Sequence, residues 1–175
     1  MAQVSDGTRF ENPRALKSAL AKLKRLQRAV SRRQKGSTNR TKAVKLLAKV
    51  QYRVANIRKD ALHQATTYLA KTQSVIVLED LNVSGMLKNH HLAQAIADVS
   101  MSEFRRQLSY KAAWYGCEIL IADRFYPSTK RCSRCGAVKP VMSLGEREYR
   151  CECCGFVVDR DLNAAINLEQ LIYSS

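Results

Sequence analysis

The sequence predicts an α/β fold that carries a basic helical hairpin and a small cysteine-rich ribbon. Three observations lead to this fold class: a cationic segment with helical apolar spacing, two short β-branched runs that lead into acids, and two paired cysteine motifs. At 175 residues, the chain is long enough for one compact core with small attachments, since single cores take up roughly 100 to 150 residues.

Positive charge is concentrated in residues 14–60. This segment holds sixteen Lys and Arg residues with Asp60 as its one acid, and the whole chain carries a net charge of +15. Salt bridges within the protein do not explain so large an excess of cations over acids. The excess therefore favours a surface that contacts nucleic acid over a helix face that is merely solvated. Each phosphate that a cation neutralises releases condensed counterions, so the expected partner is a polyanion.

The same cationic segment predicts two helices paired as a hairpin. Its apolar residues recur at steps of three and four, first within residues 16–30 and then within residues 47–61. Gly36 and its short polar neighbours mark the break between the two helices. Either Ser37 or Thr38 is expected to cap the second helix, because both side chains can accept a bond from a free backbone N–H.

Two short runs of mostly β-branched and apolar residues predict buried strands. Residues 74–78 lead directly into Glu79, and residues 117–122 lead into Asp123. Acids at the ends of buried strands are candidates for a functional site.

Two further helices are expected around these strands. Residues 92–115 are amphipathic with a break near Ser100, where Glu103 is placed three residues later as in a capping box. Gly116 is expected to end that helix. Residues 159–168 form the last predicted helix, with acids in the first turn, where the helix dipole favours negative charge.

Glu79 and Asp161 are candidate members of a carboxylate cluster. A nuclease that cuts phosphodiesters with two metal ions needs several Asp or Glu side chains that converge on hard cations such as Mg²⁺. An acid after a strand or in a first helical turn is also common as a cap or a solvated group, so the pattern alone leaves both interpretations open.

Four cysteines form the most specific motif in the sequence. Cys132 and Cys135 make one C-x-x-C pair, Cys151 and Cys154 make another, and fifteen residues separate the pairs, close to the spacing of a Cys₄ zinc site. Cys153 offers an alternative ligand, but only Cys151 with Cys154 preserves two intervening residues. Because four thiolates fill a tetrahedron, the expected Zn²⁺ is structural.

The sequence favours a cytoplasmic protein without membrane contact. No run of about 18 apolar residues occurs, and the first ten residues lack the apolar core of a signal peptide. Paired C-x-x-C spacings indicate metal ligands in a reducing cytosol.

Three stretches of the sequence can be compared with known families. They are Val75-Ile-Val-Leu-Glu79-Asp-Leu-Asn-Val, Phe125-Tyr-Pro-Ser-Thr-Lys-Arg-Cys-Ser-Arg-Cys-Gly136 and Cys154-Gly-Phe-Val-Val-Asp-Arg-Asp161-Leu-Asn-Ala-Ala-Ile-Asn167. These stretches closely resemble the C-terminal half of the TnpB family, transposon-encoded RNA-guided nucleases related to the type V CRISPR effectors. A zinc ribbon between the second and third acids of a RuvC-like nuclease is characteristic of this group, and the resemblance covers essentially the whole chain.

The resemblance implies an incomplete RuvC-like (RNase H-type) domain with an inserted basic helical hairpin and a Cys₄ zinc ribbon. It implies Glu79 as the second catalytic carboxylate and Asp161 as the third, with Asp159 as second choice. It also implies Mg²⁺ as the catalytic ion, DNA and guide RNA as partners, and a role in transposition. The expected segments are 1–13 (remnant of N-terminal RuvC-like strands), 14–72 (basic helical hairpin), 73–127 (RuvC-like core), 128–157 (zinc ribbon) and 158–175 (C-terminal RuvC-like helix).

The family's first catalytic Asp lies on a strand just before a segment like Ser5-Asp6-Gly7, and this sequence does not contain that strand. Loss of one of three metal-binding carboxylates should weaken Mg²⁺ binding and abolish most cleavage, so we expect a nucleic-acid-binding chain that is cleavage-deficient alone. The strand at 75–78 would also have an unpaired flank, which predicts homodimerisation, association with a full-length nuclease, or a rearranged sheet.

Two alternatives stay open at this point. One is an active metal-dependent DNA nuclease whose site another chain completes. The other is a regulatory or assembly subunit that binds the full-length nuclease or its guide RNA.

Overall fold

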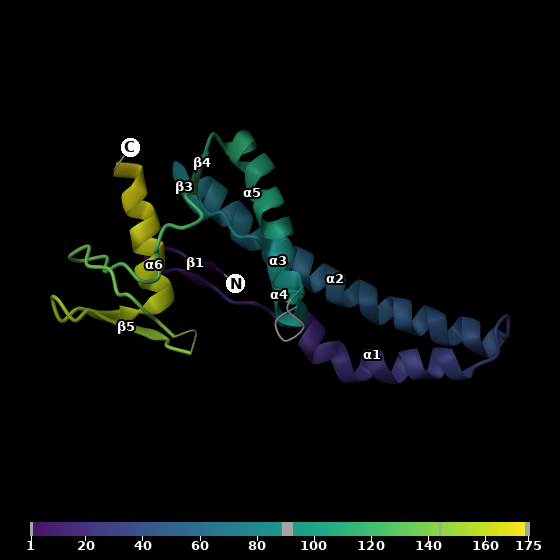
Figure 1. The fold of residues 1–175 in the computed structure, drawn as a ribbon. Helices are drawn as coiled ribbons and strands as arrows, with labels where there is room; N and C mark the ends of the chain where they lie inside the picture. Colours follow the sequence, from purple (N-terminus) through teal and green to yellow (C-terminus); the bar gives the residue numbers. More distant parts are fainter. Residues whose placement is uncertain (1, 89–92, 144, 174–175) are drawn as a thin grey trace. The chain divides into compact units, whose positions relative to one another are not determined.

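The structure, a computed structural model, describes residues 2–88, 93–143 and 145–173 (Figure 1). The chain divides into two units, the first made of Met1–Glu11, Ala65–Asn82 and Leu108–Ser175 and the second of Asn12–Gln64 and Val83–Gln107. The boundaries of the five segments expected from the sequence stay a prediction. None of the helices in the described ranges has the length and apolar character needed to cross a membrane.

The second unit contains the predicted helical hairpin. Helix α1 (Ala15–Arg32) and the first part of α2 (Thr38–Thr72) run side by side in opposite directions, joined by a short turn (Figure 1). Ser37 caps α2, since its Oγ accepts a hydrogen bond of 3.2 Å from the backbone N–H of Arg40, which confirms one of the two expected caps. The apolar residues buried along these two helices within this unit are Ala15, Leu23, Ala43, Val54 and Leu62.

A helix break occurs where the sequence predicts it, but the expected capping box is wrong. Helices α4 (Ala93–Val99) and α5 (Met101–Tyr115) meet at Ser100, whose φ of 56° is left-handed. The backbone N–H of Ser100 already donates to Ile96 O at 3.1 Å, so a capping-box acceptor is not needed. Glu103 instead accepts from Arg106 Nε at 2.7 Å, which lowers the pKa of Glu103 to about 2. The short helix α3 (Val83–Leu87) precedes α4 and packs against it.

A buried ion pair ties three parts of the second unit together. Asp98, only 6% exposed, accepts from Arg58 Nε at 2.8 Å and from the backbone N–H of Leu16 at 3.2 Å. The carboxylate thus joins α4 to the hairpin and also satisfies a free N–H in the first turn of α1.

The first unit carries the strands. In chain order, β3 (Val75–Glu79) and β4 (Glu118–Ala122) pair in parallel, with Glu79 opposite Ala122, so both expected strands are confirmed and their acidic ends lie together. Helix α6 (Arg160–Glu169) and the short helix η1 (Gln170–Tyr173) pack against β3. Among the described residues, β4 is the one strand hydrogen-bonded to β3.

Two small antiparallel pairs complete this unit. Strand β1 (Ala2–Gln3) pairs with β2 (Arg9–Phe10), and β5 (Glu148–Arg150) pairs with β6 (Val157–Asp159). The second pair belongs to the cysteine segment and leads directly into α6, so the end of the ribbon and the start of this helix form one continuous piece of chain.

Replacing Asp98 by Asn should lower the free energy of unfolding by about 1–3 kcal/mol, because Arg58 loses its counterion in a largely buried place. Urea denaturation followed by circular dichroism measures this loss. Asp60→Asn is the matched control, since Asp60 is exposed and accepts a hydrogen bond of 2.9 Å from the nearby Gln64 amide. Equal effects of the two substitutions would contradict a structural role for the Asp98 pair.

Candidate metal centre and carboxylate site

The four predicted cysteine ligands lie on two turns of nearly the same construction. In the first turn, the N–H of Gly136 donates to Cys132 O at 2.9 Å, and in the second, the N–H of Gly155 donates to Cys151 O at 3.1 Å. Both glycines have left-handed φ values, 76° and 70°, which a residue with a side chain adopts only with strain. Each C-x-x-C-G sequence therefore folds as a tight knuckle with its two thiols on one side.

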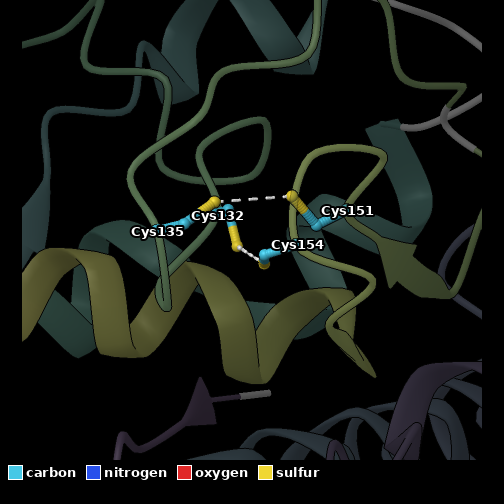
Figure 2. A group of neighbouring side chains, drawn as sticks. All are labelled: Cys132, Cys135, Cys151 and Cys154. Atoms are coloured by element: carbon cyan, nitrogen blue, oxygen red, sulfur yellow. Dashed lines mark hydrogen bonds between the residues drawn. The ribbon is translucent and has the colours of Figure 1, made fainter.

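The two knuckles bring the four Sγ atoms together. All four lie within 4.8 Å of one another, with Cys132 3.8 Å from Cys154 and Cys135 3.6 Å from Cys151 (Figure 2). A tetrahedral zinc with Zn–S bonds of about 2.3 Å needs sulfur atoms about 3.8 Å apart. The cluster therefore fits zinc binding. The four clustered thiols are the four that the sequence predicts, whereas Cys153 is exposed and does not belong to the cluster. That these four residues are the zinc ligands stays a prediction.

The electrostatics of the four thiols also suit a cation. The backbone N–H of Cys154, helped by that of Cys153, lowers the pKa of the Cys151 thiol to about 6. At Cys135, the N–H of Ala137 acts to lower the pKa, but hydrogen bonds with the neighbouring thiols and burial together raise it to about 12. Four thiolates at this spacing repel one another, and a divalent cation is what would let all four ionise.

A small apolar core supports the knuckles. Tyr149 on β5 is fully buried beside Cys132 and Cys151, and its hydroxyl donates to Lys130 O at 3.2 Å. Burial raises the pKa of Tyr149 to about 12, so the hydroxyl stays a donor at neutral pH. The partly buried residues around this core are Ala137, Met142, Cys154, Phe156 and Val158.

Two asparagines on α6 hold the segment that enters the first knuckle. Asn163 Nδ2 donates to Arg131 O at 2.7 Å, while its Oδ1 accepts from the backbone N–H of Ser133 at 3.0 Å. One turn later, Asn167 Nδ2 donates to Ser128 O at 2.8 Å and to Arg131 O at 2.6 Å. Both asparagine side chains are fully buried, so residues 128–133 are fixed to the helix by bonds that water does not replace.

The same segment contacts Glu79. The hydroxyl of Ser128, itself 4% exposed, donates to Glu79 Oε1 at 2.5 Å. Glu79 also lines a hollow of about 80 Å³ together with Asp80 and Asp123, which puts three carboxylates at the acidic ends of β3 and β4. Arg124 pairs with Asp80 at 2.5 Å and offsets part of this negative charge.

Asp159 and Asp161 lie at the start of α6 and have different partners. Asp159 is the N-cap, because its Oδ1 accepts from the N–H groups of Asp161 at 2.9 Å and Leu162 at 3.1 Å. Asp161, about half exposed, pairs with Arg160 at 3.1 Å. The cap gives Asp159 a structural role, whereas Asp161 is held by a side-chain ion pair in a more exposed place.

The structure places Glu79 and Asp161 in one unit but shows no direct contact between their side chains in the described part of the chain. Leu168 of α6 lines the hollow beside Glu79. Asp161 precedes it by seven residues on the same helix, which is about 10 Å along the axis. That both acids hold one metal pair stays a prediction.

Ser128, Asn163 and Asn167 are structural residues of this site that sequence reasoning missed. The available signal was the pair of amides four residues apart beside Ala164, which puts two polar groups on one helix face. A polar pair at this spacing usually faces solvent. Here both amides are buried because they form hydrogen bonds with the backbone of residues 128–133.

Two family models match the chain. The OrfB model of IS605-type elements, described as "Probable transposase", matches residues 1–90, and the model of the "Cas12f1-like, TNB domain" matches residues 102–168. The second match spans both cysteine knuckles and most of α6.

Curated relatives share most of this chain. A protein of Streptomyces pristinaespiralis named "Putative RNA-guided DNA endonuclease" is 44% identical over 168 residues, which are 96% of this chain and 42% of the relative. The Escherichia coli protein "Putative RNA-guided DNA endonuclease InsQ" is 36% identical over 183 residues, or 96% of this chain and 45% of the relative. The chain thus spans less than half the length of these relatives.

Solved structures share the fold. Cas12f1 in a complex with single guide RNA and target DNA superposes with a TM-score of 0.61 at 18% identity, covering 87% of this chain and 41% of that chain. A CRISPR-Cas12f ternary complex gives a TM-score of 0.60 at 22% identity, covering 87% and 31%. These likenesses confirm the predicted α/β, RuvC-like fold class.

Purified protein should contain about one zinc ion per chain, since four thiols at this spacing make one closed tetrahedral site. Mass spectrometry of the metal content measures it. Cys132→Ser should lose the zinc and lower the melting temperature, whereas Cys153→Ser should keep both. Zinc retention by Cys132→Ser, or an equal loss in Cys153→Ser, would contradict the assignment of the four ligands.

Replacing Asn167 by Ala should lower the free energy of unfolding by about 1–3 kcal/mol, because the carbonyl of Ser128 loses its donor, whereas that of Arg131 keeps its bond from Asn163. Thermal or urea unfolding of the zinc-loaded protein measures this change. Gln170→Ala is the control: its amide also donates to a carbonyl of the same segment, Ser133 O at 2.9 Å, but in an exposed place. A control that loses as much stability as Asn167→Ala would show that burial of the bond is not what matters.

Proposed function

Because the chain belongs to the OrfB probable-transposase family, the family of the TnpB-like proteins, we propose that it is the nucleic-acid-binding C-terminal portion of a TnpB-type RNA-guided DNA endonuclease. The observation that carries this proposal is the cationic hairpin, with sixteen Lys and Arg against one acid in residues 14–60. We place its action in the cytoplasm, where its thiols stay reduced and nucleic acid is at hand.

The hairpin contacts the phosphate backbone of RNA or DNA. One face of α1 presents Lys24, Arg28 and Arg32 around a shallow hollow of about 280 Å³, and all three side chains are exposed. Polar Gln27 and Ser31 complete the lining, so the face offers charge and hydrogen bonds without an acid. Such a surface binds phosphates independently of base sequence, which suits a guide RNA or a guide–target duplex.

The cysteine cluster binds Zn²⁺ as a structural ion. With its four ligands in place, the metal would have no open position, so its role is to hold the two knuckles together. Through residues 128–133, the first knuckle continues into the contact between Ser128 and Glu79. Zinc binding therefore supports the carboxylate site without taking part in chemistry.

Glu79 and Asp161 are the residues of this chain that would hold catalytic Mg²⁺. Carboxylate oxygens are the donors that Mg²⁺ prefers, and the hollow beside Glu79 offers two further carboxylates, Asp80 and Asp123. When bound, the ion would polarise the scissile phosphate and activate water. Ser128 orients Glu79, and Arg160 holds the Asp161 carboxylate until a cation competes for it.

As a 175-residue polypeptide on its own, the chain is cleavage-deficient. The resemblance to the family supplies Glu79 and Asp161 as two of three catalytic carboxylates. Asp80 and Asp123 do not replace the third, because Asp80 pairs with Arg124 and Asp123 accepts from the backbone N–H of Phe125. What it retains is binding, through the hairpin and the ribbon.

A second candidate function is an active nuclease whose site is completed by another chain. The pairing of β3 supports it, since β4 is its one strand partner in the described part of the chain. The opposite edge of β3 then offers backbone N–H and C=O groups to a strand supplied in trans.

Binding of single-stranded RNA should weaken steeply with salt, because it depends on released counterions. Fluorescence anisotropy between 50 and 200 mM salt gives the slope of log Kd against log salt. Substituting Arg28 and Arg32 by Gln should reduce that slope by about 1.4, at about 0.7 per phosphate contact on a single strand. The control changes Arg105 and Arg106 on α5 to Gln, which removes the same charge, and an equal reduction there would contradict contact through α1.

Supercoiled DNA incubated with the purified chain, Mg²⁺ and co-purifying RNA should stay uncut within the detection limit. Gel analysis of nicked and linear products measures this. Cleavage that disappears in Glu79→Gln would overturn the cleavage-deficient proposal and favour the second candidate. Cleavage that persists in Glu79→Gln would come from a contaminating nuclease. Both proteins would then be purified further until Glu79→Gln shows no cleavage, and the unmodified chain would be assayed again.

A further inference from the structure

A groove of about 620 Å³ runs between α1 and α2 in the hairpin, separate from the face that carries Lys24, Arg28 and Arg32. Its volume lies within the range of roughly 300 to 1,000 Å³ that is typical of ligand sites. The lining residues are Lys22, Arg25 and Leu26 from α1, and Leu46, Lys49, Val50, Tyr52, Arg53, Asn56 and Ile57 from α2.

The groove combines an apolar floor with a cationic rim. Leu26 and Val50 are half-buried, whereas the four cations are exposed, and none of the ten lining residues is acidic. An occupant must therefore offer both negative charge and apolar surface. A second copy of this chain does not fit, because two hairpins with this excess of cations repel each other.

The side chains of Tyr52 and Asn56 further restrict the kind of ligand that the groove would bind. Tyr52 is 70% exposed, so its ring is accessible to a partner that enters the groove. Asn56 follows one turn later on the same face of α2, with both a donor and an acceptor on its amide. A nucleobase offers a flat face for the ring and a polar edge for the amide, and its phosphates meet the rim.

We propose that this groove binds an unpaired base of a single-stranded nucleic acid. Tyr52 stacks on the base, Asn56 bonds to its edge, and Lys22, Arg25, Lys49 and Arg53 contact the flanking phosphates. The base-binding proposal rests on the proposed function only in that the hairpin contacts nucleic acid. It adds a site that recognises a base to a contact otherwise made between cations and phosphates.

The test compares two labelled RNA 12-mers of equal charge, one with normal bases and one with abasic residues at its centre. Intact protein should bind the normal strand roughly 5- to 150-fold more tightly, the range expected for stacking of one base. Tyr52→Ala should remove most of that preference while leaving affinity for the abasic strand unchanged, and Tyr52→Phe should retain it. Tyr173→Ala, which truncates another exposed tyrosine outside the hairpin, is the control and should behave like the intact protein.

The outcomes separate this proposal from the one it rests on. Equal, salt-sensitive binding of both strands would overturn the base site and leave the phosphate contact standing, whereas no binding of either would overturn both. A DNA pair of the same design assigns the base to RNA or to DNA. An acidic amphipathic peptide is the third arm: if it binds with dependence on Tyr52 and the oligonucleotides do not, the groove belongs to a protein partner and the proposal fails.

Discussion

The amide bonds from α6 to residues 128–133 are the constraint on which the rest of the first unit depends. Asn163 and Asn167 satisfy carbonyls that would otherwise be buried without a donor, and such groups are costly to leave unpaired. The segment they hold carries Cys132 at one end and Ser128, the partner of Glu79, at the other. One helix thereby sets the positions of a metal-binding knuckle and of a carboxylate at the end of a parallel strand.

Within the described residues, the protein lacks counterions in two places: the cysteine cluster, whose thiolates would be negative, and the hairpin, whose side chains are positive. The four thiols of the cysteine cluster cannot all ionise side by side without a cation, as the raised pKa of Cys135 illustrates. The hairpin carries sixteen cations that one acid cannot neutralise. The buried pair of Asp98 with Arg58 shows that the fold does neutralise charge where packing demands it. These two exceptions are the places where we propose that the protein binds a metal ion and a polyanion.

Features that depend on spacing within a short stretch could be predicted from the sequence, and features that depend on long-range contacts could not. The two strands and the break near Ser100 follow local patterns and are confirmed. The clustering of the four predicted cysteines also follows a local pattern, while their role as zinc ligands stays a prediction. The contact between Ser128 and Glu79 joins residues 49 positions apart, so no local pattern reveals it. The prediction of a capping box was wrong for a local reason. Ser100 has a left-handed φ, and its backbone N–H donates to Ile96 O in the preceding turn. Whether Asp161 reaches the same metal as Glu79 is again a long-range matter and stays a prediction.

The first unit is assembled from three separated stretches of chain, and this has a consequence for the order of events during synthesis. Helix α6 and its asparagines leave the ribosome long after β3, whose parallel partner β4 also comes late. Non-local pairings of this kind form slowly, whereas the hairpin needs only neighbouring residues. The cationic helices can therefore take shape while α6 and its asparagines are still being translated.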